Sequence, residues 1–124
     1  MANGILTTWW LPFGRVNEIA PATLHQQLAD PQCPPQLLDV RTALEWQQGH
    51  IAGAVNAPIT SLAREIDSLD LDPDRPVVAI CLTAHRSIPA VRLLRRRGFR
   101  AATQLAGGMR AWRRAKLPTV RPTD

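Results

Sequence analysis

The sequence predicts a single α/β domain with a mainly parallel central sheet and helices on both faces. The chain has 124 residues, which is the length of one compact domain, and 45% of them are hydrophobic, enough to form a core. Segments typical of strands alternate with segments typical of helices, as in parallel α/β folds. Residues 77–81, VVAIC, form an apolar, β-branched run, which is typical of a strand in the middle of such a sheet.

Short strands and helices alternate in the first third of the chain. We expect a strand at 16–20 and a helix at 22–30, in which Leu24 and Leu28 lie on one face. A loop rich in proline then leads to a buried strand at 36–40.

A helix start is visible after that strand. Thr42 is followed three residues later by Glu45, a capping-box pattern that predicts a helix over 42–48, and Gly49 ends it. Residues 49–58 contain two glycines and a proline and predict a turn-rich crossing with one short extended piece.

The second half continues the alternation. We expect a helix at 61–69, the strand at 77–81, a weaker strand at 102–106 and a last helix at 109–115. Between the strands at 77–81 and 102–106 we expect an amphipathic helix that begins with Ser87 as its N-cap, has Pro89 in its first turn and ends at Gly98. Its inward-facing residues are predicted to be Ile88, Val91 and Leu94.

The domain is predicted to cover residues 16–118, between an apolar extension at 1–15 and a tail at 119–124. The extension has neither a basic leading region nor a cleavage site, and no apolar run is long enough to cross a membrane, so we expect a cytoplasmic protein without an integral membrane segment. Its Trp9–Phe13 stretch is interpreted as packing on its own domain or on a dimer mate, in preference to a membrane surface.

The net charge of +5 is concentrated in residues 63–124, which carry thirteen basic residues against six acids. Such a surface attracts anions. No RNA-binding signature or aromatic stacking platform accompanies it, so we expect solvated helix faces and no nucleic-acid partner.

Cys33 and Cys81 do not form a disulfide framework, and no Cys or His spacing is typical of a metal site. We therefore expect neither metal nor cofactor. Cys33 is interpreted as a surface thiol without a role.

Cys81 is the candidate nucleophile. It ends a strand and precedes the amino end of a helix, where unpaired N–H groups and the helix dipole favour a thiolate. The loop between Cys81 and Ser87 is long enough to aim several amides at the sulfur, and Arg86 adds a permanent charge suited to sulfonyl or phosphoryl oxygens. The alternative is an inert cysteine buried at the end of a strand.

Three segments in order resemble the rhodanese-like domains, over roughly residues 16–118. They are LLDVRTALEWQQGHIAGAVNAP, VVAICLTAHRSIPAVRLLRRRGF and LAGGMRAW. The resemblance implies a sulfurtransferase that moves sulfane sulfur from thiosulfate, or a similar small anionic donor, to cyanide or a thiol, with a protein acceptor as a further candidate. It assigns Cys81 as the persulfide carrier, Arg86 as the anion anchor, and the amides of Leu82, Thr83, Ala84, His85, Arg86 and Ser87 as the persulfide cradle.

Two features of the loop bear on this function. Four residues separate Cys81 from Arg86, one fewer than in the phosphatases of this fold, which favours sulfur over phosphate chemistry. Ala84 stands where the family usually has glycine, and alanine is strained there if the position requires a positive φ. Two alternatives stay open, namely a sulfur carrier or interaction module without turnover and, less favoured, a phosphatase or arsenate reductase.

Other residues are weighed in the same way. The alternative role for Cys33 is to resolve the persulfide. His85 is either a ligand of the donor or an exposed side chain without a role. Asp39 and Arg41 are expected to support the structure, with Arg41 and Glu45 spaced for an ion pair on the helix. His50 is expected to bond to backbone, and Gly107 and Gly108 to border the pocket without doing chemistry.

Overall fold

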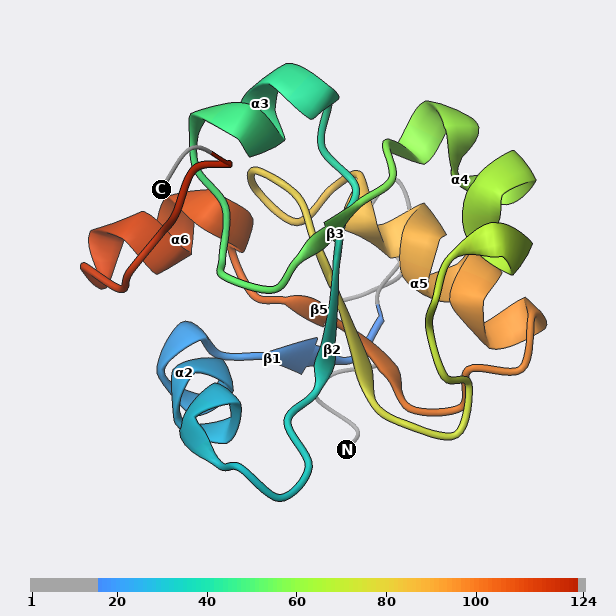
Figure 1. The fold of residues 1–124 in the computed structure, drawn as a ribbon, viewed down its shortest axis with the longest axis horizontal. Helices are drawn as coiled ribbons and strands as arrows, with labels where there is room; N and C mark the ends of the chain where they lie inside the picture. The colour runs from blue at the N-terminus through green and yellow to red at the C-terminus, as the bar shows by residue number, and fades with distance from the viewer. Residues whose placement is uncertain (1–15, 123–124) are drawn as a thin grey trace, which may run out of the picture.

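The computed structural model describes residues 16–122, so the expectation for Trp9–Phe13 lies outside the described residues. The fold is the predicted α/β domain, with helices on both faces of a central sheet (Figure 1). In chain order the elements are β1 (Glu18–Ile19), α2 (Pro21–Ala29), β2 (Gln36–Asp39), α3 (Ala43–Gln48), β3 (Val55–Asn56), α4 (Ile59–Glu65), the 3-10 helix η1 (Ile66–Ser68), β4 (Val77–Ile80), α5 (Ser87–Arg96), β5 (Ala102–Leu105) and α6 (Gly108–Arg114).

The five strands form one sheet in the order β1-β5-β4-β2-β3, and every pair is parallel. β4 lies in the middle, which its continuous apolar sequence predicted. Its register pairs Asp39 of β2 with Ile80. The residues that follow both strands, including Cys81, therefore emerge side by side at the carboxyl edge of the sheet, where ligands bind in such folds.

Alternate residues of the strands fill two cores, one on each face. On one face, Leu38, Ala79 and Cys81 pack with residues of α4 and α5. On the other, Val78 and Ile80 pack with residues of α2 and α6, among them Trp112.

The arrangement of the helices agrees closely with the sequence. Thr42 and Glu45 form a complete capping box at the start of α3. Ile88, Val91 and Leu94 are buried on the inner face of α5, as predicted. α4 begins at Ile59, two residues before the predicted start, and passes into η1.

Ser87 is not the N-cap of α5, contrary to the prediction. The N-cap is Arg86, and Ser87 is the first helical residue and is fully buried. Its side chain makes no capping bond because its hydroxyl donates to Gln104 Oε1 (2.6 Å) inside the protein.

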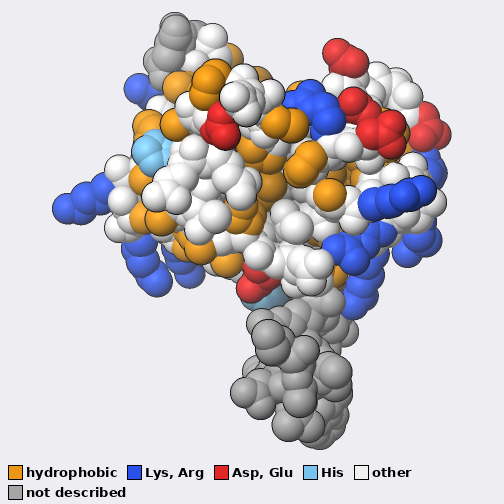
Figure 2. Space-filling model, turned by 90° about the horizontal axis from the view of Figure 1, so that it is seen from below, with side chains coloured by type: hydrophobic (Ala, Val, Ile, Leu, Met, Phe, Trp, Pro, Cys, Tyr) orange, Lys and Arg blue, Asp and Glu red, His pale blue; other side chains and the backbone are white. Residues whose placement is uncertain are grey.

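A groove of about 570 Å³ opens where strand β2 begins, away from the Cys81 loop. It lies between α2 and the segment after α6, and its lining includes Leu28, Leu37, Ile51, Trp112 and Val120. Figure 2, which views the molecule from below, shows hydrophobic side chains near the centre of this end and Lys and Arg side chains mainly around its edge. No helix within residues 16–122 has the length and hydropathy needed to span a membrane.

Candidate functional site

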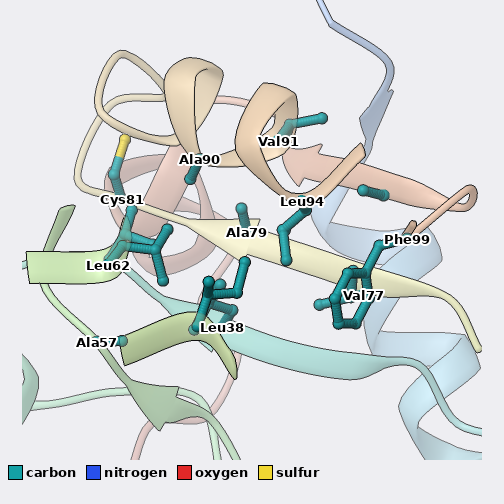
Figure 3. Close-up of a cluster of buried hydrophobic side chains, with 13 residues drawn as sticks. Leu38, Ala57, Leu62, Val77, Ala79, Cys81, Ala90, Val91, Leu94 and Phe99 are labelled. Carbon is teal, nitrogen blue, oxygen red and sulfur yellow. The ribbon is translucent and has the colours of Figure 1, made fainter. Parts of the chain in front are cut away.

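Cys81 lies directly after β4 and is almost fully buried, with 1% of its surface exposed. Figure 3 shows its sulfur directed toward the loop that curls over the end of the strand. The other free cysteine of the described chain, Cys33, is exposed in the loop between α2 and β2. Position therefore distinguishes the two thiols, because only Cys81 lies at the carboxyl edge of the sheet.

One group of the loop and one of the first turn of α5 contact the Cys81 sulfur. The Ala84 N–H donates a hydrogen bond to Sγ (2.9 Å), and the Ser87 hydroxyl oxygen lies 3.4 Å from Sγ. A backbone N–H that points at a sulfur stabilises its anionic form. The structure thus provides one amide of the predicted cradle at hydrogen-bond distance from the resting cysteine.

Ala84 adopts a φ of 78°, in the left-handed region where glycine is favoured. The condition under which alanine would be strained is therefore met. In this conformation the Ala84 amide points at the sulfur, although the residue has a Cβ.

The remaining loop residues face other partners. Leu82 is half-buried and packs against the core on the α6 face, while Thr83 Oγ1 and His85 Nδ1 lie 3.0 Å apart at the surface. The His85 side chain is thus exposed beside the loop and does not contact the sulfur.

The start of α6 holds the loop from the other side. The amides of Met109 and Arg110 donate to the carbonyl oxygens of Cys81 (2.8 Å) and Leu82 (3.0 Å). Gly108 permits this approach, since a Cβ there would lie 2.4 Å from the Cys81 oxygen and 2.5 Å from the Leu82 carbonyl. Gly108 therefore lets α6 hold the backbone of the loop, while Gly107 is the N-cap of α6 and adopts a φ of 70°.

Arg86 is held by Glu45 from α3. Its guanidinium donates to both carboxylate oxygens, at 2.8 and 3.0 Å, and 34% of its side chain stays exposed. The pKa of Glu45 is lowered from 4.5 to about 2, chiefly by the hydrogen bonds from Arg86 and also by the bonds from Thr42, while burial opposes the shift. The same pairing raises the pKa of Arg86. Glu45 is therefore a residue of the site, whereas the sequence predicted it only as a capping residue and a partner for Arg41.

Arg41 pairs with Asp39 and not with Glu45, which corrects the expected helix pair. Both side chains are buried, and Arg41 donates to both Asp39 oxygens and to the Gly49 carbonyl (2.8 Å). Arg41 points into the protein because Asp39 is its buried counter-ion at the end of β2. The pair supports the turn at Gly49, in agreement with the predicted structural role.

His50 also has the expected structural role. Its Nδ1 lies 2.7 Å from the Trp46 carbonyl oxygen, and its ring stacks on Trp46 with 3.9 Å between centroids. Within residues 16–122, no cluster of three or more His, Cys, Asp or Glu side chains is arranged to hold a metal ion.

Gln104 and its partner Glu18, which connect with the site through Ser87, were missed from sequence. Gln104 in β5 accepts a hydrogen bond from Ser87 and donates one to Glu18 of β1 at 2.8 Å. A buried glutamine in an apolar strand was the available signal, because buried polar side chains require partners.

Comparison with known proteins agrees with this geometry. The family model described as the rhodanese-like domain matches residues 20–115. The chain belongs to the rhodanese-like family. A sulfurtransferase from Allochromatium vinosum is 37% identical over 107 residues, covering 86% of this chain and 97% of that protein.

Solved structures of rhodanese-like proteins share the fold. A rhodanese-related protein from Thermoplasma volcanium superposes with a TM-score of 0.74 at 28% identity, covering 85% of this chain and 98% of that one. A thiosulfate sulfurtransferase from Pseudomonas aeruginosa superposes with a TM-score of 0.74 at 26% identity, covering 86% of this chain but 20% of that one. Membership of the family supports sulfurtransferase activity in general.

Proposed function

We propose that this rhodanese-like protein transfers sulfane sulfur through a persulfide on Cys81. The Cys81 thiolate attacks the outer sulfur of thiosulfate or a similar anionic donor, and for thiosulfate sulfite leaves with the electron pair of the broken S–S bond. Cyanide or a thiolate then attacks the outer sulfur of the persulfide, which restores the Cys81 thiolate. The observation that carries the proposal is the Ala84 N–H held 2.9 Å from a sulfur at the end of the central strand.

Electrostatics supports an anionic intermediate at this place. A persulfide keeps a negative charge on its outer sulfur, so one set of amides serves both forms of a two-step cycle. We assign the cradle to the backbone from Leu82 to Ser87, in which Ala84 contributes the bond seen in the resting protein.

Arg86 is proposed as the anchor for the donor's oxygens. A guanidinium has five N–H donors, and Glu45 occupies two of them. The exposed third of the side chain leaves N–H groups for an anion, and Glu45 fixes the orientation of the Arg86 guanidinium.

Both thiols are free, so we also propose a reducing compartment, the cytoplasm, as the location.

A second function, a carrier that receives sulfur from a protein partner, is favoured by one observation. Glu45 neutralises the charge of Arg86, and Cys81 is nearly closed to solvent, so a small free anion meets a weakened field and a buried sulfur. Slow turnover of thiosulfate and cyanide together with ready acceptance of sulfur from a protein persulfide would favour the carrier.

Mass spectrometry of the intact protein tests the proposed function. After exposure to thiosulfate, we expect the mass of one added sulfur atom in the wild type and in Cys33→Ser, and no addition in Cys81→Ser. If folded wild-type protein gains no sulfur from thiosulfate, from other small donors or from a protein persulfide, the proposal is wrong.

A further inference from the structure

A row of hydrogen-bonded side chains connects the Cys81 sulfur with the edge strand of the sheet. The Ser87 oxygen lies 3.4 Å from the sulfur, the Ser87 hydroxyl donates to Gln104 Oε1 at 2.6 Å, and Gln104 Nε2 donates to Glu18 Oε2 at 2.8 Å. Ser87 and Gln104 are buried, whereas Glu18 is exposed on β1. The row therefore links the buried Cys81 to the surface carboxylate of Glu18, which lies 63 positions earlier in the chain.

Glu18 determines the direction of every bond in this row. A carboxylate only accepts hydrogen bonds, so the Gln104 amide must turn its N–H toward Glu18 and its oxygen toward Ser87. The Ser87 proton is then committed to Gln104 Oε1. Ser87 consequently presents only lone pairs to the Cys81 sulfur.

Two neighbours of the sulfur therefore favour opposite protonation states. The Ser87 oxygen can accept a bond from the S–H group of a thiol but offers nothing to a thiolate, whereas the Ala84 N–H favours the thiolate. To donate to an anionic sulfur, Ser87 must withdraw its proton from Gln104, and the buried Gln104 oxygen then loses its partner.

We propose that Glu18 is a positioning residue which, through Gln104, keeps Ser87 as a hydrogen-bond acceptor and so restrains Cys81 in its less nucleophilic thiol form. Glu18 makes no contact with the sulfur and acts only through the hydrogen bonds of Gln104 and Ser87. This inference concerns the same cysteine as the proposed sulfur transfer, but it does not depend on any sulfur donor.

Alkylation of Cys81 by iodoacetamide measures the restraint directly. In Glu18→Gln, the new amide accepts as well as donates, so Gln104 is free to turn over and give its N–H to Ser87, which then donates to the sulfur. A hydrogen bond gained by the thiolate is worth about a three- to tenfold change in its population. We expect the Glu18→Gln rate at pH 6 to exceed the wild-type rate by that factor, and the two rates to agree on the high-pH plateau.

Other charged groups near the sulfur are left unchanged in this comparison. They are Arg86 with its partner Glu45, His85 in the loop, and the Asp39–Arg41 pair at the end of β2. The Cys33→Ser background removes the exposed thiol from the assay. Asp74→Asn, which removes one negative charge from an exposed loop before β4, is the control for net charge and should leave the rate unchanged.

A double-mutant comparison separates the hydrogen-bond row from the simple loss of the Glu18 charge. In a Ser87→Ala background no hydroxyl is present to reverse, so Glu18→Gln should leave the alkylation rate unchanged. A Glu18→Gln rate equal to the wild type, or an equal acceleration with and without Ser87, would overturn the proposal. Because no sulfur donor is used, this outcome is distinguishable from a failure of persulfide formation.

Discussion

Glu45 and Arg86 lie 41 residues apart in the chain and form two hydrogen bonds, at 2.8 and 3.0 Å, beside the Cys81 loop. The capping box of α3 places the carboxylate, since Glu45 also accepts from the Thr42 N–H (3.0 Å). The first turn of α3 thus holds the last residue of the loop before α5. One carboxylate both caps a helix and orients the proposed anion anchor.

Replacing Glu45 by glutamine should reduce stability at neutral pH by about 1 kcal/mol, the scale of a partly exposed ion pair. The amide keeps the capping acceptor and removes the charge. Because the pKa of Glu45 is lowered to about 2 in the folded protein, the wild type gains stability from the pair above pH 4.5 and loses it as the pH falls toward 2. Urea unfolding at several pH values should show the two proteins converging between pH 4.5 and 2.

Asp67→Asn is the matched control for that titration. Asp67 pairs with Arg97, but 83% of its side chain is exposed, so the neutral variant should unfold like the wild type at every pH. A constant difference between Glu45→Gln and wild type down to pH 2 would contradict the assigned role of the Glu45 charge.

Replacing Arg86 by alanine should lower kcat/KM for thiosulfate by about ten- to a hundredfold, the value of a charge-assisted hydrogen bond to a donor oxygen. The Glu45 carboxylate would then lack its partner and would also repel the anion. Alkylation of Cys81 by neutral iodoacetamide should continue, because the reagent needs no anchor. Steady-state kinetics of the two proteins check this, and equal kcat/KM values would count against anchoring by Arg86.

Ala84→Gly should stabilise the protein by about 1 kcal/mol, because φ is 78° and a left-handed conformation costs a residue with a Cβ roughly that much. The opposite sign is expected for Ala63→Gly, an exposed position inside α4, where glycine destabilises a helix by about 1 kcal/mol. The midpoints of urea unfolding measure both. A loss of stability in both variants would show that the loop does not strain Ala84.

The sequence predicts the elements well where local patterns determine them. The apolar run of β4, the capping box at Thr42 and the inner face of α5 all depend on near neighbours in the chain. They also place Cys81 correctly at the carboxyl edge of the sheet.

Side-chain partners across the fold were harder to predict. Glu45 has Arg41 four residues away, yet it binds Arg86, because the buried Asp39 takes Arg41. Ser87 has the residue type of an N-cap, but Gln104 takes its hydroxyl. Glu45 and Ser87 thus each bind a residue that is distant in the chain, Arg86 and Gln104 respectively, and only the packing of strands and helices brings these partners together.

Gly108→Ala tests how closely α6 and the Cys81 loop fit together. A Cβ at this position would lie 2.4–2.5 Å from loop backbone atoms, which cannot move aside as a flexible side chain would. The added methyl group should therefore push the loop away from α6 and weaken the hydrogen bonds from Met109 and Arg110. Backbone strain and overpacking together should destabilise the protein by about 2–4 kcal/mol.

Gly98→Ala is the matched control, since Gly98 has a φ of 94° and a Cβ added there would meet nothing within 4 Å. This variant should lose only about 1 kcal/mol of unfolding free energy. Urea unfolding together with the alkylation rate of Cys81 distinguishes the two, because only Gly108→Ala should change the reactivity of the sulfur. Equal losses of stability with unchanged alkylation in both variants would mean that α6 does not hold the loop.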